Sequence, residues 1–194
     1  MLEIQFPFPH RYEIEEIPEF PSTGSFPEPV FYFPKPKERP EHDGLWLKFH
    51  DADGHSWIGI FAFGDYSLTR VISSPDPNRV CIISKGNAYA VMANQPQTWE
   101  RVPVLPVLDV RTVRQHGLLV FSDFTGLAAY GSRGLVWQSP RLCWDRLKIL
   151  NVTDNTIEGT GYDPTHAAHG SDQMNFAVDL RTGRSLPSSP HQVM

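Results

Sequence analysis

The sequence predicts an all-β protein, built as a propeller-like array of short antiparallel four-stranded units, and three observations support this. From residue 44 onward, the chain alternates short apolar runs with turn signals rich in Gly, Pro, Asn and Asp. In every stretch long enough for an amphipathic helix, either the apolar residues do not recur with the 3.6-residue period of a helix or a helix-breaking residue interrupts them. Apolar positions also recur at an interval of about 38 residues. Four short strands fit into one such interval, which is the size of a propeller blade.

The composition is that of a globular chain. Its 194 residues suffice for one domain with an arm, and hydrophobic residues make up 40% against 20% charged residues. These values argue against a disordered or membrane-embedded class. The net charge of −5 comes without any basic cluster that could follow a phosphate backbone. We therefore expect neither nucleic acid nor a membrane as a partner.

The start of the chain and its two cysteines predict a cytoplasmic location. Met1 is followed by Leu-Glu-Ile-Gln-Phe and then by prolines, which is not the pattern of a secretory signal. Cys81 and Cys143 each lie in an apolar context. We expect buried free thiols at both positions, with a single disulfide as the alternative.

Residues 1–43 differ from the rest of the chain, because they hold nine of its eighteen prolines. Proline removes a backbone donor and fixes φ, which prevents long helices and central strands. The segment nevertheless carries eight aromatic residues: Phe6, Phe8, Tyr12, Phe20, Phe26, Phe31, Tyr32 and Phe33. We expect an extended arm that buries these rings on the folded body. The alternative is a proline-rich ligand for an aromatic groove of a partner. The predicted organisation is an arm (1–43), a β-repeat domain (44–186) and a flexible C-terminal tail (187–194).

The clearest hairpin signal is Asp51-Ala-Asp-Gly, which separates two apolar runs. Gly54 suits the left-handed position of the turn. Trp46 and Trp57 would then lie opposite each other and pair on the core face. The turn also resembles the start of a calcium loop, but the later acidic ligands that such a loop needs are missing. A hairpin turn accounts for it.

The repeat is clearest in the middle of the chain. At an offset of 38 residues, Val80–Ser84 falls on Leu118–Ser122, and Trp99 falls on Trp137. Residues 175–183 read as a further copy, displaced by an insertion of 11 residues. We expect Trp99 and Trp137 to occupy equivalent positions and to pack between neighbouring units.

The last copy of the repeat, at residues 175–183, contains a motif that is similar to one in a known family. Ala177-Val-Asp-Leu-Arg-Thr-Gly183 resembles the A-x-D-x-x-T-G core of the quinoprotein-like (PQQ-type) β-propeller repeat, and the resemblance extends over roughly residues 78–186. In that family, a tryptophan after the Thr-Gly turn docks between blades. The copy ending at Trp137 has Tyr130 and Arg133 in place of the Asp and Thr.

The resemblance implies three or four blades, as a small closed propeller or an open arc whose edges need cover. A β-sandwich made from the same hairpins is the alternative fold. The repeat is a packing device, so it implies no bound cofactor.

The insertion holds the only spacing that suggests a metal: Asp163, His166, His169 and Asp172. Imidazole and carboxylate ligands suit zinc or a similar divalent cation. The same residues are also typical of an exposed polar loop. No nucleophile elbow, phosphate-binding loop or Cys-His pair is present, so we assign no catalytic residue.

These observations favour a non-catalytic binding or protein-interaction scaffold. Its partner would be another protein or a second copy of the chain, held through sheet edges or the N-terminal arm. One alternative is a metal-dependent enzyme that uses the 163–172 loop. The other is a binder of a small ligand or carbohydrate at a tryptophan-lined surface, for which the candidates are Trp46, Trp57, Trp99, Trp137 and Trp144.

Overall fold

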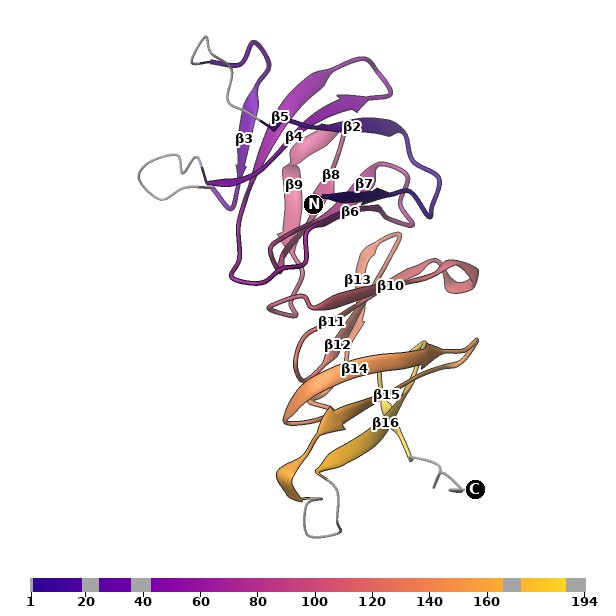
Figure 1. Ribbon diagram of the computed structural model, residues 1–194. Helices are drawn as coiled ribbons and strands as arrows, with labels where there is room; N and C mark the ends of the chain where they lie inside the picture. Colours follow the sequence, from indigo (N-terminus) through magenta and orange to yellow (C-terminus); the bar gives the residue numbers. More distant parts are fainter. Residues whose placement is uncertain (1, 19–24, 36–42, 166–171, 188–194) are drawn as a thin grey trace. The chain divides into compact units, whose positions relative to one another are not determined.

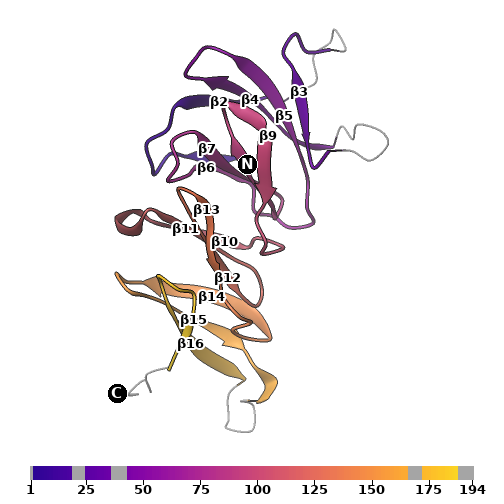
Figure 2. The ribbon, with the colours of Figure 1, turned by 180° about the vertical axis from the view of Figure 1, so that it is seen from behind.

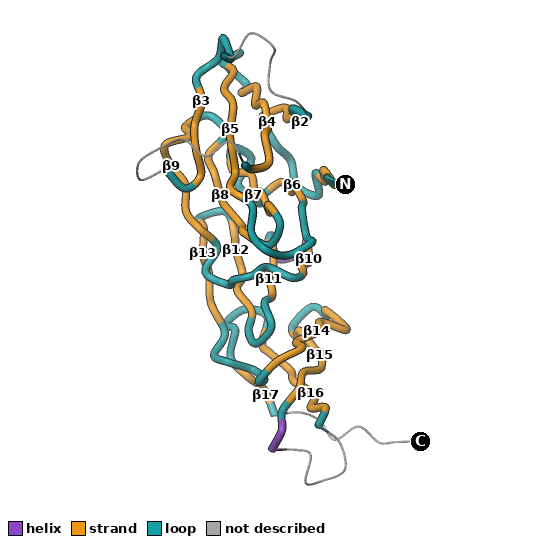
Figure 3. The backbone as a smooth tube through the Cα atoms, turned by 60° about the vertical axis from the view of Figure 1, so that its left-hand side comes forward, coloured by secondary structure: helices purple, strands orange, loops and turns teal. Residues whose placement is uncertain are grey.

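The computed structural model describes residues 2–18, 25–35, 43–165 and 172–187. Strands dominate these residues (Figure 3), and none of them lies in an α-helix. A turn of 3-10 helix, η1 (Arg114–His116), connects β10 (Asp109–Val113) to β11 (Leu118–Ser122), and residues 164–165 also adopt a 3-10 conformation. The all-β prediction is confirmed. No helix in the described part of the chain is long and apolar enough to cross a membrane.

The described strands form four small, mainly antiparallel sheets (Figure 1). Sheet A has the order β1 (Glu3–Gln5), β6 (Arg70–Ser73), β7 (Arg79–Ser84), β8 (Asn87–Met92), β9 (Gln95–Arg101). Sheet B has the order β2 (Tyr12–Glu16), β4 (Gly44–Asp51), β5 (Ser56–Ala62), β3 (Val30–Phe33). Sheet C has the order β10 (Asp109–Val113), β11 (Leu118–Ser122), β12 (Leu127–Gly131), β13 (Gly134–Gln138). Sheet D has the order β14 (Asp145–Val152), β15 (Thr156–Tyr162), β16 (Gln173–Asp179), β17 (Ser185–Leu186).

The chain divides into two compact units, unit 1 (Met1–Val107) and unit 2 (Leu108–Met194). Unit 1 holds sheets A and B, and unit 2 holds sheets C and D. The predicted arm (1–43) falls within unit 1, because its described strands are hydrogen-bonded members of sheets A and B.

The N-terminal arm supplies three edge strands. β1 pairs in parallel with β6, β2 pairs antiparallel with β4, and β3 pairs in parallel with β5. Both edges of sheet B are therefore arm strands. Tyr12 and Phe33, which are 4% and 2% exposed, enter the core of unit 1. Phe6 stays exposed, and Phe20 lies outside the described residues.

Aromatic rings dominate the core of unit 1, which joins residues of sheets A and B. Phe49 stacks on Trp57 with ring centroids 3.9 Å apart, and Phe33 stacks on Phe61 at 4.6 Å. The indole N–H of Trp57, on sheet B, donates to the carbonyl of Ala93, which follows β8 of sheet A, at 2.7 Å. This bond gives a buried polar group its partner and ties the two sheets together.

The β4–β5 hairpin is confirmed, and Gly54 has a left-handed φ of +84°. The predicted pairing of the two tryptophans is wrong. Trp46 lies opposite Ile60, whereas Trp57 lies opposite Phe49. Because side chains alternate across a strand, Trp46 faces away from the core that Phe49 enters.

The registers around Trp99 and Trp137 coincide. Trp99 pairs with Val91 and Trp137 with Ala129, and a register shift follows each pair. The offset is different in the preceding strands, β7 and β11. Val91 pairs with Val80 and Ala129 pairs with Val120, and these two valines are 40 rather than 38 residues apart. The β11–β12 loop has four residues and the β7–β8 turn has two, which accounts for the difference.

In unit 2, Trp137 lies between sheets C and D, as expected for a packing residue. Its indole N–H donates to the carbonyl of Leu180, which follows β16, at 2.8 Å. Gly183 lies against the indole ring with a φ of +70°, and a Cβ there would be 2.5 Å from a ring carbon. The position therefore requires glycine for its space and for its backbone conformation.

The A-x-D-x-x-T-G motif forms the turn after β16. The Asp179 carboxylate accepts hydrogen bonds from the Thr182 hydroxyl at 2.7 Å and from the backbone N–H groups of Thr182 and Arg181 at 2.8 and 3.1 Å. These bonds, that from the Thr182 hydroxyl first, lower the pKa of Asp179. The motif residues are thus explained by turn formation.

Candidate functional site

The strongest candidate site lies on the outer face of sheet D, which we define as the face turned away from the core of unit 2. Along β14, Leu147 and Ile149 enter that core, so Arg146 and Lys148 lie on the outer face. The strands β14, β15 and β16 run side by side (Figure 2). At one end they enclose a pocket of about 170 Å³, lined by Arg146, Thr160, Gly161, Tyr162, Asp172 and Gln173.

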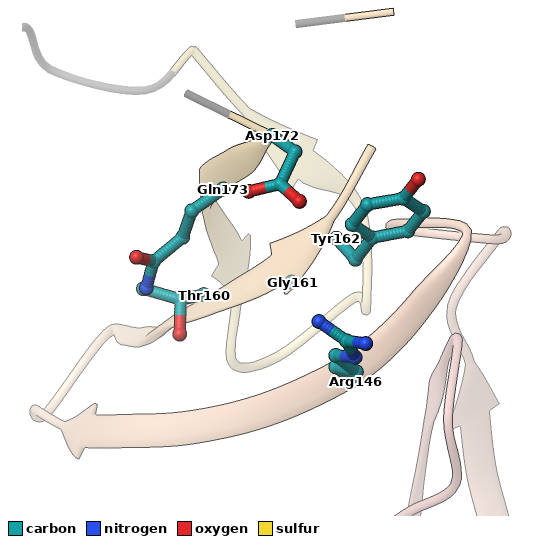
Figure 4. A pocket seen from close by; sticks show the side chains of 6 residues that line it. All are labelled: Arg146, Thr160, Gly161, Tyr162, Asp172 and Gln173. Carbon is teal, nitrogen blue, oxygen red and sulfur yellow. The ribbon is translucent and has the colours of Figure 1, made fainter. Parts of the chain in front are cut away.

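Gly161 forms the floor of this pocket, and Arg146 and Asp172 approach it from opposite sides (Figure 4). A Cβ at Gly161 would point away from the pocket and lie 2.5 Å from the sulfur of Cys143. Thr160 and Tyr162, its neighbours in β15, project to the pocket side. Glycine therefore lets Cys143 pack beneath the strand while bare backbone faces the pocket.

Arg146 has an unusual backbone. Its φ is +56°, a left-handed conformation that costs a residue other than glycine about 1–2 kcal/mol. It lies where the pairing of β14 with β15 shifts register, between Asp145 and Lys148. Its own N–H donates to the Asp145 carboxylate at 2.7 Å. This bulge turns the Arg146 side chain toward Tyr162, whose ring centre is 5.5 Å from the guanidinium carbon.

Beside the pocket, Trp144 is held firmly although its side chain is largely exposed. It is 54% exposed, and its backbone N–H donates to the Tyr162 carbonyl at 2.8 Å. The guanidinium of Arg141 lies 4.8 Å from the centre of the indole ring. Arg141 is itself fixed by hydrogen bonds of 3.0 Å to the carbonyls of Cys143 and Trp144. The result is an ordered aromatic surface next to Tyr162.

The structure brings together the two ends of the predicted metal loop. The backbone N–H of Asp163 donates to the carbonyl of Asp172 at 2.9 Å. The Asp163 carboxylate accepts from the Thr165 N–H at 2.9 Å and from its hydroxyl at 2.7 Å, whereas Asp172 lines the pocket. His166 and His169 lie outside the described residues. The four-residue metal set therefore stays a prediction.

A second acidic group lies in unit 1, at the β4–β5 turn. Ligand atoms of Asp51, Asp53 and His55 lie within 4.8 Å of one another. The Asp51 carboxylate accepts the N–H groups of Asp53 and His55, both at 2.9 Å, and contacts the His55 ring at 3.2 Å. Burial raises the pKa of Asp51, but these hydrogen bonds outweigh it and lower the pKa overall. Turn formation thus explains the group.

Both cysteines are free and buried, as predicted. Burial raises the pKa of Cys81 to about 12 and also raises that of Cys143. Because the thiolate is the reactive form, neither thiol is set up as a nucleophile.

Comparison with protein-family models finds no match to this chain, and comparison with curated proteins finds none either. No relative therefore supplies a role for the pocket or for Trp144.

Of the residues that line the pocket, the sequence predicted only Asp172 as a site residue, as a metal ligand. The alternation of Arg146 and Lys148 with apolar residues is a visible sign of an outward polar face. The left-handed backbone of Arg146 has no sequence signature, because no glycine or asparagine marks it. The pairing of Gln173 with Tyr162 across the insertion is also invisible in the sequence.

Proposed function

We propose that this chain is a non-catalytic, cytoplasmic binding protein that holds a protein partner on the outer face of sheet D. Trp144 carries the proposal, because it is exposed, ordered by Arg141, and adjacent to Tyr162 and Arg146. Tryptophan, tyrosine and arginine are the residues that dominate binding energy at protein interfaces. A fixed side chain also loses less entropy when it is covered by a partner.

Recognition through side chains suits this surface better than addition of a strand. β14 is an edge strand, but two register shifts interrupt its pairing with β15. In addition, the backbone N–H of Leu147 in β14 already donates to the Phe124 carbonyl at 3.0 Å. Bulges of this kind protect an edge from pairing with another chain.

The proposal treats the four small sheets as propeller-like units, and the site lies on sheet D. It is supported by the similar bonds of Trp57 and Trp137, which donate from sheets B and C to the carbonyls of Ala93 and Leu180, directly after β8 of sheet A and β16 of sheet D. The buried free thiols fit a reducing compartment. Their raised pKa values favour binding over nucleophilic catalysis.

A displayed random-peptide library, selected on the whole chain, tests the proposal. We expect selected peptides to lose about 30-fold in affinity on Trp144→Ala, the loss typical of an interface hot spot. Leu105→Ala is the matched control, because Leu105 is exposed but lies in unit 1. It should leave the affinity unchanged. Peptides that bind both variants equally, or a selection without binders, would contradict the proposal.

A further inference from the structure

The pocket on sheet D holds two opposite charges that do not pair. Arg146 and Asp172 line the same space of about 170 Å³. Among the described residues, Arg146 forms no ion pair with any carboxylate. The two charges are kept apart, across the bare backbone of Gly161 (Figure 4).

The backbone of Arg146 shows that its side chain is specifically positioned. Its left-handed φ of +56° would be free of strain with glycine. Arginine there carries an energetic cost that its described protein contacts, one ring and one local hydrogen bond, do little to offset. Contact with the face of Tyr162 orients the guanidinium plane but leaves its N–H fork available for a carboxylate.

The remaining lining groups limit the ligand to a small polar molecule. Thr160 offers a hydroxyl and Gln173 an amide at the rim. The missing side chain at Gly161 allows a ligand to approach the main chain closely. A volume of about 170 Å³ accepts a single small metabolite and is too small for a nucleotide or a folded peptide segment.

We propose that this pocket binds a small zwitterion of the α-amino acid type, with its carboxylate on Arg146 and its ammonium group on Asp172. A free amino acid carries both charges a few bond lengths apart, and Arg146 and Asp172 line one space of about 170 Å³. The pocket adjoins the partner surface at Trp144 and shares Arg146 and Tyr162 with it, so the amino acid would be a second, small-molecule ligand on the same face of sheet D.

Titration calorimetry of the full chain with three matched probes tests the assignment. L-Alanine should bind with a Kd of roughly 0.1–1 mM, the range open to so few atoms. N-Acetyl-L-alanine lacks the ammonium group, and L-alaninamide lacks the carboxylate. Each should bind about tenfold or more weakly, because each loses one charge-assisted interaction. Equal binding of all three probes would overturn the proposal, as would no alanine binding at about 10 mM.

Two variants assign the charges to their residues. Arg146→Gly should abolish the preference for alanine over alaninamide, and Asp172→Asn the preference for alanine over N-acetylalanine. Arg146→Gly should keep or raise the Tm, because glycine relieves the left-handed backbone. Lys85→Gly is the control, since Lys85 also has a positive φ, of 47°, but lies in unit 1. Alanine affinities that are the same in wild type and in both pocket variants would contradict the assignment.

Discussion

The outer faces of sheets B and D differ in how far other residues of the chain cover them. The outer face of sheet B carries Trp46 and Ile60 beside Lys48, and the N-terminal arm covers part of it: Phe26 lies 5.6 Å from Trp46, and Glu28 binds Lys48 at 2.7 Å. On the corresponding face of sheet D, the charged Arg146 and Lys148 are exposed, and Leu150 beside them is 60% exposed. The chain uses its own residues to cover a face that water disfavours. The polar face keeps its charged groups accessible, which is what a binding surface requires.

Removing residues 1–43 should have the largest effect, because it deletes both edges of sheet B. Unit 1 loses the buried rings of Tyr12 and Phe33. Losses of about 3–5 kcal/mol for each large aromatic ring approach the whole stability of a domain, which is about 5–15 kcal/mol. We expect hydrogen exchange to show slow amides in unit 2 and none in unit 1.

Phe6→Ala in the full chain is the control, because Phe6 belongs to the same arm but is exposed. It should change the free energy of unfolding by less than about 0.5 kcal/mol. A truncated chain that keeps the wild-type Tm would instead make the arm a ligand for a partner.

Trp57 and Trp137 allow a matched comparison of the two cores. Replacing either with phenylalanine removes the indole N–H and leaves a carbonyl unpaired, at a cost of about 1–3 kcal/mol. Replacing either with alanine should cost about 3–5 kcal/mol. The loss at Trp57 should be larger by about 0.5–1.5 kcal/mol, because among the described residues Trp57 stacks on another ring, that of Phe49, and Trp137 does not.

Urea unfolding of the four variants measures these differences, with Trp144→Phe as the exposed control. If Trp57→Phe and Trp137→Phe are both as stable as wild type, the two indole bonds do not hold the sheets together.

The parts of the fold that follow local rules could be predicted from the sequence. The β4–β5 hairpin follows from its turn, where Asp51 accepts backbone N–H groups and Gly54 adopts a positive φ. The inter-sheet position of Trp137 was predicted from the recurrence of apolar positions about 38 residues apart. The parallel pairing of β1 with β6 and of β3 with β5 could not be predicted, because it depends on contacts between distant segments.

The candidate site was harder to predict than the fold. Asp172 was visible as a polar residue in an insertion, but its neighbours across the sheet were not. Arg146 and Tyr162 come from β14 and β15, and the register shift that brings Arg146 to the pocket leaves no trace in composition or periodicity.

The acid sensitivity of two turns gives the smallest predicted effect. Hydrogen bonds lower the pKa of both Asp51 in unit 1 and Asp179 in unit 2. A carboxyl group whose pKa is lower in the folded state stabilises the fold above its unfolded pKa of about 3.9, and this stabilisation is lost as the pH falls through the folded pKa. Asp51→Asn and Asp179→Asn should each flatten the fall in Tm between about pH 5 and about pH 2.

The change should be larger for Asp51, whose side chain is 6% exposed and therefore less screened by water than that of the half-buried Asp179. Calorimetric Tm profiles of wild type and of both variants measure it. If both variants follow the wild-type profile throughout this range, the two turns do not contribute to the acid sensitivity of either unit.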